Sequence, residues 1–308
     1  MIACVFSGQG SQKPGMGTDL CAVSPAARAV YGQASAVLGF DVLALDEEQL
    51  TQTRYAQLAI VTLSMAAWAA FKEQAGTLPP LAFAGFSLGE YSALGAAGVL
   101  DLPELLALVQ ERSRLMQEAT DSVAGAMYAV MGMDEQLLLE VVARPQFAGQ
   151  VFAVNFNSPG QIVIAGLEGA AAACAEELTA AGARKIRKLN VSGAFHTPLM
   201  ADAAHRLTEY ARRLTFRTPT APFYSNSGRC LSPDVSWPEY LSEHMCSPVR
   251  WTEEVLQLHA DGAEKFIEFG PGKVLTGLIR KITADVPAMP VEDSKTLADA
   301  VSALTMPD

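Results

Sequence analysis

A serine flanked by two glycines, in the segment Gly85-Phe86-Ser87-Leu88-Gly89, is the pattern in this sequence that most directly implies chemistry. An apolar run precedes it, and a helical pattern follows at 90–97. This is the layout of the nucleophile elbow G-x-S-x-G, a sharp turn from strand to helix that exposes the serine hydroxyl. The glycines allow backbone segments to approach closely, and the N–H of Leu88 would point at a bound acyl oxygen. We interpret Ser87 as a nucleophile, with an ordinary Gly-Ser turn as the alternative.

A serine nucleophile needs a base, and the sequence offers four histidines. His205 lies in a charged helical pattern and His244 in a polar, loop-like stretch, while His259 ends a predicted helix, where an imidazolium is favourable in any case. His196 lies in the small-residue segment 192–198, at a predicted junction between two parts of the chain, and clefts form at such junctions. His196 is therefore the candidate base, and a buried structural histidine is the alternative.

One arginine falls on an apolar helix face. In the helix predicted over 102–120, apolar residues recur at helical spacing, for example at Leu105, Leu108 and Met116. Arg112 lies on the same stripe. A buried guanidinium is costly unless it is paired, and its planar fork binds a carboxylate through two hydrogen bonds. The position predicts either an internal salt bridge or a site for an anionic ligand.

The first predicted strand, 1–7, opens onto Gly8-Gln9-Gly10. This loop is either an ordinary turn or a source of backbone N–H donors beside the active site. A dinucleotide site is weakly supported, because Lys13 stands where the third glycine of G-x-G-x-x-G belongs.

A basic cluster stands out in an otherwise acidic chain: Arg184, Lys185, Arg187 and Lys188. A solvated surface is the commonest meaning of such a cluster. The alternative is a docking surface for an acidic partner.

The elements that must position these residues follow two patterns. Apolar runs alternate with helical patterns through about residue 120, which predicts a parallel sheet covered by helices. The middle of the chain instead predicts strands at 126–131, 151–155, 161–165 and 185–191, with helices at 134–143 and 167–181. The resulting order β-α-β-β-α-β is that of a ferredoxin-like unit. We expect an α/β protein, with a large parallel-sheet domain formed by residues 1–123 and 193–308 and a ferredoxin-like subdomain inserted at 124–192.

Composition excludes several classes of function. The chain has 308 residues and a net charge of -11, which argues against binding to nucleic acid or an anionic membrane. Its five cysteines are scattered, without the spacing of a zinc site or a disulfide framework. The longest apolar stretch, 58–71, is too short to span a membrane. We expect a cytoplasmic protein without a metal or a bound cofactor.

Several motifs in this order resemble those of the malonyl-CoA:acyl carrier protein transacylases and the acyltransferase domains of fatty-acid and polyketide synthases. The similarity runs nearly from end to end and includes 6–12, 85–94, Arg112 with 116–117, 154–161, 195–200 and 268–275. Within 154–161, Asn155 and Asn157 match the family pattern but receive no role. The resemblance implies a hydrolase-like large domain with a ferredoxin-like insert, in agreement with the strand and helix patterns.

The resemblance also implies a role for individual residues. Ser87 is similar to the family's nucleophile and His196 to its base. A backbone carbonyl, rather than a carboxylate, orients the histidine in this family, and the matching position here is Arg250. The two backbone donors of the oxyanion hole correspond to Gln9 and Leu88. Arg112 resembles the residue that binds the free malonyl carboxylate.

Two phenylalanines are predicted to line the substrate site. Phe86 stands just before the nucleophile, where many relatives have histidine, so a polar neighbour of Ser87 is lost. Phe195 matches the bulky residue of malonyl-selective synthase domains. A methyl-sized misfit against its ring is worth about 1–3 kcal/mol, which disfavours a methylmalonyl group.

The expected function is transfer of a malonyl group from malonyl-CoA to the phosphopantetheine thiol of acyl carrier protein, through a malonyl-serine, in fatty-acid biosynthesis. Malonyl-CoA is a substrate here, and acyl carrier protein is the partner that the basic cluster would bind. A malonyl transferase acting in trans on a polyketide synthase is the first alternative. A serine thioesterase or esterase, with His259 as base, and a non-catalytic carrier-protein binding module are the others.

Overall fold

The large part of the molecule is built around a parallel sheet of four strands in the order β10-β9-β1-β2. The computed structural model describes residues 1–191 and 193–305. Within it, the sheet strands are β1 (Ile2–Phe6), β2 (Leu81–Gly85), β9 (Lys265–Phe269) and β10 (Ala288–Val291). Parallel strands covered on both faces have continuous apolar sequences, and the apolar run before the elbow is accordingly strand β2.

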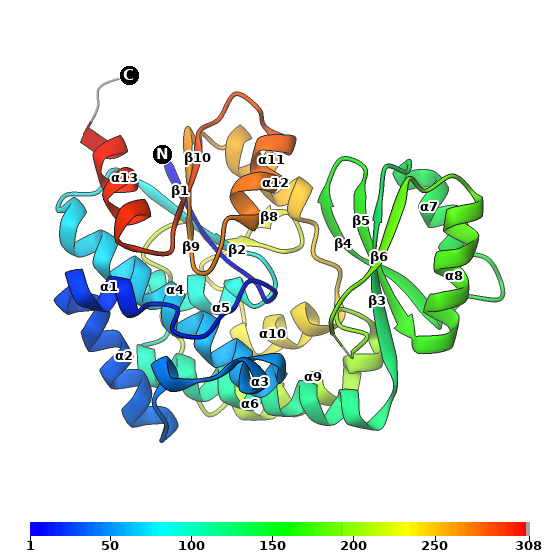
Figure 1. Ribbon diagram of the computed structural model, residues 1–308, viewed down its shortest axis with the longest axis horizontal. Helices are drawn as coiled ribbons and strands as arrows, with labels where there is room; N and C mark the ends of the chain where they lie inside the picture. Colours follow the sequence, from blue (N-terminus) through cyan, green and yellow to red (C-terminus); the bar gives the residue numbers. More distant parts are fainter. Residues whose placement is uncertain (192, 306–308) are drawn as a thin grey trace.

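Alternate residues of these strands enter two separate hydrophobic cores. Cys4 and Phe6 point to the core formed with the long helix α4 (Thr53–Ala75). Ala3 and Val5 point the other way, to a core shared with two later helices, α11 (Trp251–Ala260) and α12 (Val274–Ile282). Figure 1 shows the sheet between these two groups of helices. The sheet is therefore a covered α/β layer, with its loops free to carry functional groups.

The middle of the chain forms a second sheet, which is antiparallel and lies beside the first part of the molecule (Figure 1). Its strands follow the order β4-β5-β3-β6, and helices α7 and α8 pack on one face. Read along the chain, this is the order of a ferredoxin-like unit, as predicted. The elements are β3 (Gly125–Met131), α7 (Glu135–Val142), β4 (Val151–Ser158), β5 (Gln161–Leu167), α8 (Glu168–Ala180) and β6 (Lys185–Lys188).

The limits of the two domains remain a prediction, and the predicted limit at residue 192 lies outside the described residues. All four strands of the small sheet differ in length from their predictions. β3 begins at Gly125 rather than at 126, and β5 continues to Leu167, beyond the predicted end at 165. β4 continues to Ser158, beyond the predicted end at 155, and β6 ends at Lys188 rather than at residue 191. The other face of the small sheet, which carries Met127 and Val163, joins the core of the large part.

Shorter elements complete the fold. The remaining helices are α1 (Thr18–Val23), α2 (Pro25–Leu38), α3 (Glu47–Thr51), α5 (Gly89–Ala96), α6 (Leu102–Ser122), α9 (Ala201–Ala211), α10 (Trp237–Cys246) and α13 (Ser294–Thr305), with single turns η1 (Val42–Ala44) and η2 (Pro198–Met200) and the hairpin of β7 (Tyr224–Ser225) with β8 (Arg229–Cys230). None of the helices in the described part of the chain is long and apolar enough to cross a membrane.

The sequence predicts a loop around His244, but the structure has helix α10 there, so His244 lies on a helix. Trp237, Leu241 and Met245 recur at helical spacing and are buried on one face of this helix. The polar residues between these apolar ones make the helical spacing hard to recognise in the sequence. His244 shares the buried face and is 4% exposed, which brings a polar ring into the interior beside the elbow.

Candidate active site

The predicted nucleophile elbow is present where β2 turns into α5. Ser87 has φ of 51°, in the left-handed region that residues with side chains rarely adopt. The glycines on either side have a steric reason. A Cβ on Gly85 would lie 2.1 Å from a backbone carbon of Gly89, and a Cβ on Gly89 would lie 1.9 Å from the carbonyl oxygen of Phe6. The turn can therefore close against β1 only without side chains at these two positions.

Ser87 and His196 form a hydrogen-bonded pair. Ser87 Oγ lies 2.7 Å from His196 Nε2. The other ring nitrogen, Nδ1, lies 3.0 Å from the carbonyl oxygen of Ser247 and 3.3 Å from that of His244. Because a carbonyl oxygen only accepts, Nδ1 carries the proton and Nε2 is free to accept the serine proton. His196 also has a positive φ, 61°, so both members of the pair have the sterically disfavoured backbone that gathers at active sites.

The carbonyl predicted to orient the histidine, that of Arg250, is the wrong one. Helix α11 begins at the next residue, and the Arg250 carbonyl accepts the backbone N–H of Glu254 at 3.0 Å, as the first acceptor of that helix. The Arg250 side chain pairs with Glu253 instead. Ser247 and His244, at the end of α10, supply the carbonyls that His196 contacts.

Burial keeps the base neutral. The pKa of His196 is lowered from 6.5 to about 4, first by burial of the ring and then by the positive charge of Arg112, while its hydrogen bonds to the Ser247 and His244 carbonyls act in the opposite direction. No carboxylate contacts the ring among the described residues. At neutral pH the imidazole is therefore uncharged, and its Nε2 can accept the proton of Ser87.

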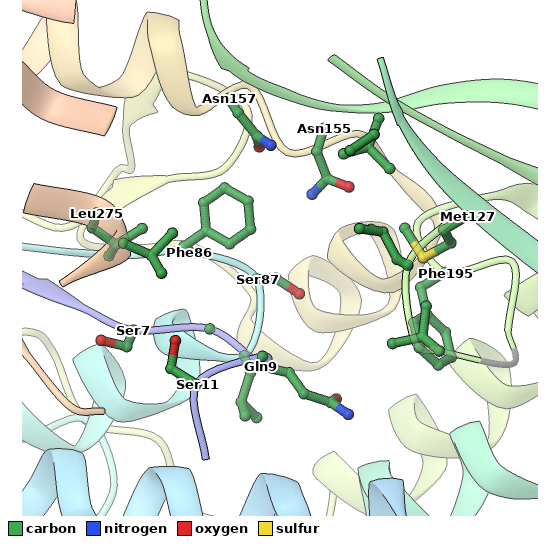
Figure 2. Close-up of a pocket in the computed structure, with 18 of the residues that line it drawn as sticks. Ser7, Gln9, Ser11, Phe86, Ser87, Met127, Asn155, Asn157, Phe195 and Leu275 are labelled. Carbon is green, nitrogen blue, oxygen red and sulfur yellow. The ribbon is translucent and has the colours of Figure 1, made fainter. Parts of the chain in front are cut away.

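Two backbone N–H groups lie beside Ser87 without an acceptor among the described residues. They belong to Leu88, at the start of α5, and Gln9, in the loop after β1. The loop is held against the elbow so closely that a Cβ on Gly8 would lie 2.7 Å from the Phe86 carbonyl oxygen. Figure 2 shows Gln9 next to Ser87 in the cavity. Free donors at this place can stabilise an oxyanion formed on the serine.

Arg112 lies in the same cavity and makes no ion pair with any described residue. It is 2% exposed, its Nη1 donates to Gln57 Oε1 at 2.6 Å, and its guanidinium lies 4.8 Å from the centre of the Tyr91 ring. Its Nε has no hydrogen-bond partner. The internal salt bridge that the sequence left open is thus not found. A buried guanidinium with unused donors is a site for an anion.

The cavity has a volume of about 430 Å³. It gathers most of the predicted site residues: Gln9, Phe86, Ser87, Leu88, Arg112, Phe195 and His196 all line it, with Asn155 and Asn157. In Figure 2, Phe86 and Leu275 lie on one side of Ser87 and Met127 and Phe195 on the other. The residues of β3 and β5 close the cavity from the small sheet, so both parts of the molecule contribute to the site.

The two predicted phenylalanines are fixed by neighbouring groups. Phe86 packs edge-on against Trp251, with ring centres 5.7 Å apart. Phe195 is buried, and a Cβ on Gly193 would lie 2.4 Å from its ring. Both rings therefore form walls of the cavity, on opposite sides of the nucleophile (Figure 2).

Sequence reasoning missed a group of buried polar residues behind the elbow. Asn226 accepts a hydrogen bond from the backbone N–H of Ser87, and Glu90 and His244 contact Asn226. Gln57, the partner of Arg112, was also missed. Glu90 follows the elbow directly and could have been noted as an acid within an apolar helix, whereas nothing near Asn226 in the sequence points to Ser87.

Most of the other candidates lie away from the cavity. His259 has its Nδ1 3.2 Å from the Ala263 carbonyl, so the base of the thioesterase alternative does not contact the elbow. All four residues of the basic cluster are exposed, on β6 or next to it. Lys188 pairs with Glu168, and Arg187 alone of the four lines the cavity. The described residues include no group of three or more His, Cys, Asp and Glu that could hold a metal ion.

A serine elbow, a neutral histidine and two free amides on an α/β sheet define an enzyme that transfers acyl groups through a serine ester. The comparisons agree with that class. The model of the acyl transferase domain family matches residues 3–298, and the chain belongs to this family. Malonyl CoA-acyl carrier protein transacylase of Escherichia coli (strain K12) is 39% identical over 309 residues, which are 97% of this chain and 98% of that protein.

Solved structures are similar over the same length. MCAT from Streptococcus pneumoniae has a TM-score of 0.92 and 36% identity, and the alignment covers 98% of this chain and 100% of that one. A malonyl-transacylase in complex with its type II PKS acyl-carrier protein has a TM-score of 0.90 and 38% identity, over 98% of this chain and 99% of that one. The hydrolase-like large sheet with its ferredoxin-like insert is thus the fold of known acyltransferases.

Proposed function

We propose that this enzyme transfers a malonyl group from malonyl-CoA to the phosphopantetheine thiol of acyl carrier protein, in fatty-acid biosynthesis. One observation carries the proposal beyond acyl transfer in general: Arg112, buried and without an ion pair among the described residues, lines the same cavity as Ser87 and His196. A malonyl thioester has a reactive carbonyl at one end and a free carboxylate at the other. The guanidinium supports a role in binding that carboxylate.

In the first half of the reaction, Ser87 Oγ attacks the thioester carbon while His196 Nε2 takes its proton. The carbonyl oxygen becomes an oxyanion, which the N–H groups of Gln9 and Leu88 stabilise. The tetrahedral intermediate then expels the coenzyme A sulfur, and the proton on His196 passes to that leaving thiolate. The product is malonyl-Ser87 with the histidine neutral again.

The second half reverses these steps with a different thiol. His196 takes the proton of the phosphopantetheine thiol, and the thiolate attacks the malonyl ester. The same amides stabilise the second oxyanion. Ser87 Oγ leaves, regains the proton from His196, and malonyl-carrier protein is released. One base thus serves both halves, which is the logic of a ping-pong transfer.

The test is an intact-mass measurement after mixing the enzyme with malonyl-CoA and acetyl-CoA in competition, with Ser87→Ala alongside. We expect one malonyl adduct on the native enzyme and none on the variant. Hydrolysis of malonyl-CoA with no adduct, and no need for carrier protein, would identify a thioesterase instead. An equal amount of acetyl adduct would contradict the role of Arg112 in selecting a malonyl group.

The exposed cations of β6 are proposed as part of the carrier-protein docking surface. Arg184, Lys185 and Arg187 have no ion-pair partner among the described residues, and Arg187 also lines the cavity that holds Ser87. Lys188, the fourth residue of the cluster, is already paired with Glu168. An acidic carrier protein bound here would place its prosthetic arm near the cavity, and charge complementarity would increase the association rate.

Charge reversal tests the docking surface. Lys185→Glu with Arg184→Glu is expected to raise the KM for carrier protein and leave the KM for malonyl-CoA unchanged. Lys295→Glu is the control, because Lys295 is an exposed cation on α13. Equal effects of the two changes on the KM for carrier protein would contradict a specific surface on β6.

A further inference from the structure

A cluster of buried polar side chains lies behind the nucleophile and takes no part in the reaction steps above. Its centre is Asn226, which is 3% exposed and follows the short strand β7. Asn226 Oδ1 accepts the backbone N–H of Ser87 at 2.7 Å. Its Nδ2 donates to the Gly85 carbonyl at 2.5 Å and to Glu254 Oε2 at 2.9 Å, and its own backbone N–H donates to Glu90. Every polar atom of this side chain is therefore used.

The two contacts to the elbow bracket the turn. Gly85 is the last residue of β2, Ser87 is the apex, and one amide side chain binds the carbonyl of the first and the N–H of the second. The backbone N–H of Ser87 donates to Asn226 rather than within the strand ladder or the helix. Without Asn226 this N–H would lose the acceptor it has in the structure. The side chain thus favours the strained form over relaxed ones.

The same cluster reaches the base. His244 Nε2 lies 3.3 Å from Asn226 Oδ1 and 3.2 Å from Glu90 Oε2, while the backbone carbonyl of His244 contacts His196 Nδ1. Tyr240, one turn earlier on α10, donates its hydroxyl to Glu90. Hydrogen bonds therefore connect the Ser87 amide through Asn226 to the His244 ring, and the backbone carbonyl of His244 contacts the ring of His196.

We infer that Asn226 is a positioning residue, which together with Glu90 and His244 holds Ser87 in its left-handed conformation and keeps Ser87 Oγ in reach of His196. Asn226 touches neither the cavity nor the reacting atoms. Its loss should change how fast Ser87 reacts and leave acyl-group binding to Arg112 intact. The inference rests on the proposed use of Ser87 as nucleophile.

The experiment compares Asn226→Ala and Asn226→Asp with Leu207→Ala, a change at a fully buried position on α9 that lies outside the elbow sequence and does not line the cavity. Asp keeps an acceptor for the Ser87 N–H but loses the donor to the Gly85 carbonyl. The first readout is the rate at which a fluorophosphonate labels Ser87. This rate is divided by the fraction of folded protein, which a thermal melt provides. The second is the rate constant for malonyl-enzyme formation, measured with Ser87 present. The third is the dissociation constant of malonyl-CoA, measured after adding Ser87→Ala to each variant so that no acyl transfer occurs.

A displacement of order 1 Å costs about 10²-fold in rate. We expect Asn226→Ala to lower both rate constants by about that factor and Asn226→Asp by less, with the dissociation constant unchanged. Leu207→Ala should melt earlier yet label at the native rate. Native labelling by folded Asn226→Ala would overturn the inference. If the native enzyme labels but forms no malonyl adduct, the proposed function fails, and the labelling rates still decide the role of Asn226.

Discussion

Removal of the Arg112 guanidinium should separate malonyl transfer from acetyl transfer. In Arg112→Ala the Ser87–His196 pair, the Gln9 and Leu88 amides and the cavity wall all remain, since none of them bonds to Arg112. What is lost is the fork of donors and the positive charge. An acetyl group has no carboxylate to bind there, so the malonyl reaction should lose far more rate than the acetyl reaction.

The magnitude follows from the burial of the arginine. The guanidinium is already buried, and binding removes the malonyl carboxylate from water beside it. Breaking such a buried pair leaves one charge uncompensated, at a cost of about 3–5 kcal/mol. Because about 1.4 kcal/mol corresponds to a factor of ten in rate, kcat/KM for malonyl-CoA should fall by about 10²- to 10⁴-fold. Arg112→Lys should lose less, since it keeps the charge but not the fork.

The assay measures kcat/KM for malonyl-CoA and acetyl-CoA with the same carrier protein, together with the melting temperature, because Gln57 also loses its partner. Arg114→Ala is the matched control. It lies on the same helix, is exposed, and pairs with Glu111 and Glu118 on the surface. An equal loss for both thioesters in Arg112→Ala would refute the carboxylate role, as would a loss in Arg114→Ala of the same size.

Three further predictions concern the base, the acyl pocket and the elbow. Because burial lowers the pKa of His196 to about 4, kcat/KM should stay level as the pH falls through 6.5 and decline only near pH 4; a decline centred at 6.5 would contradict it. Phe195→Ala should improve methylmalonyl transfer relative to malonyl transfer by about 10- to 200-fold, measured as a ratio of kcat/KM. Gly89→Ala should leave no folded, active enzyme, since its Cβ would lie 1.9 Å from the Phe6 carbonyl oxygen, whereas Gly277→Ala, with nothing within 4 Å, should fold normally by circular dichroism.

The parts of the site that the sequence predicts are those fixed by local rules. The elbow follows from steric limits over five residues, and Arg112 is visible because a charge interrupts an apolar helix stripe. The fold follows from the same kind of evidence, since strands covered on both faces are apolar throughout and the βαββαβ order is distinctive. These features need no knowledge of distant contacts.

The parts that were missed depend on which way the backbone turns. The backbone dihedral angles at the end of α10 decide which carbonyl faces His196. Every residue type has a backbone carbonyl, so the sequence does not indicate which one it is. The family resemblance therefore indicates the carbonyl of Arg250, whereas those of Ser247 and His244 contact the ring. Asn226 meets Ser87 across 139 positions, and only the folded chain brings the two together. His244 was placed in a loop because polar residues masked the apolar face of its helix.

The cavity also links recognition of the acyl group to the chemistry at its other end. The positive charge of Arg112 lowers the pKa of His196, so it opposes the imidazolium that must form as Ser87 attacks. A bound carboxylate neutralises that charge, so Arg112 no longer disfavours the imidazolium. The same contact holds the acyl group in place. An acetyl group leaves the charge in place. Discrimination between malonyl and acetyl thioesters should therefore be expressed in kcat as well as KM, because the interaction with the carboxylate is stronger when the imidazolium is present.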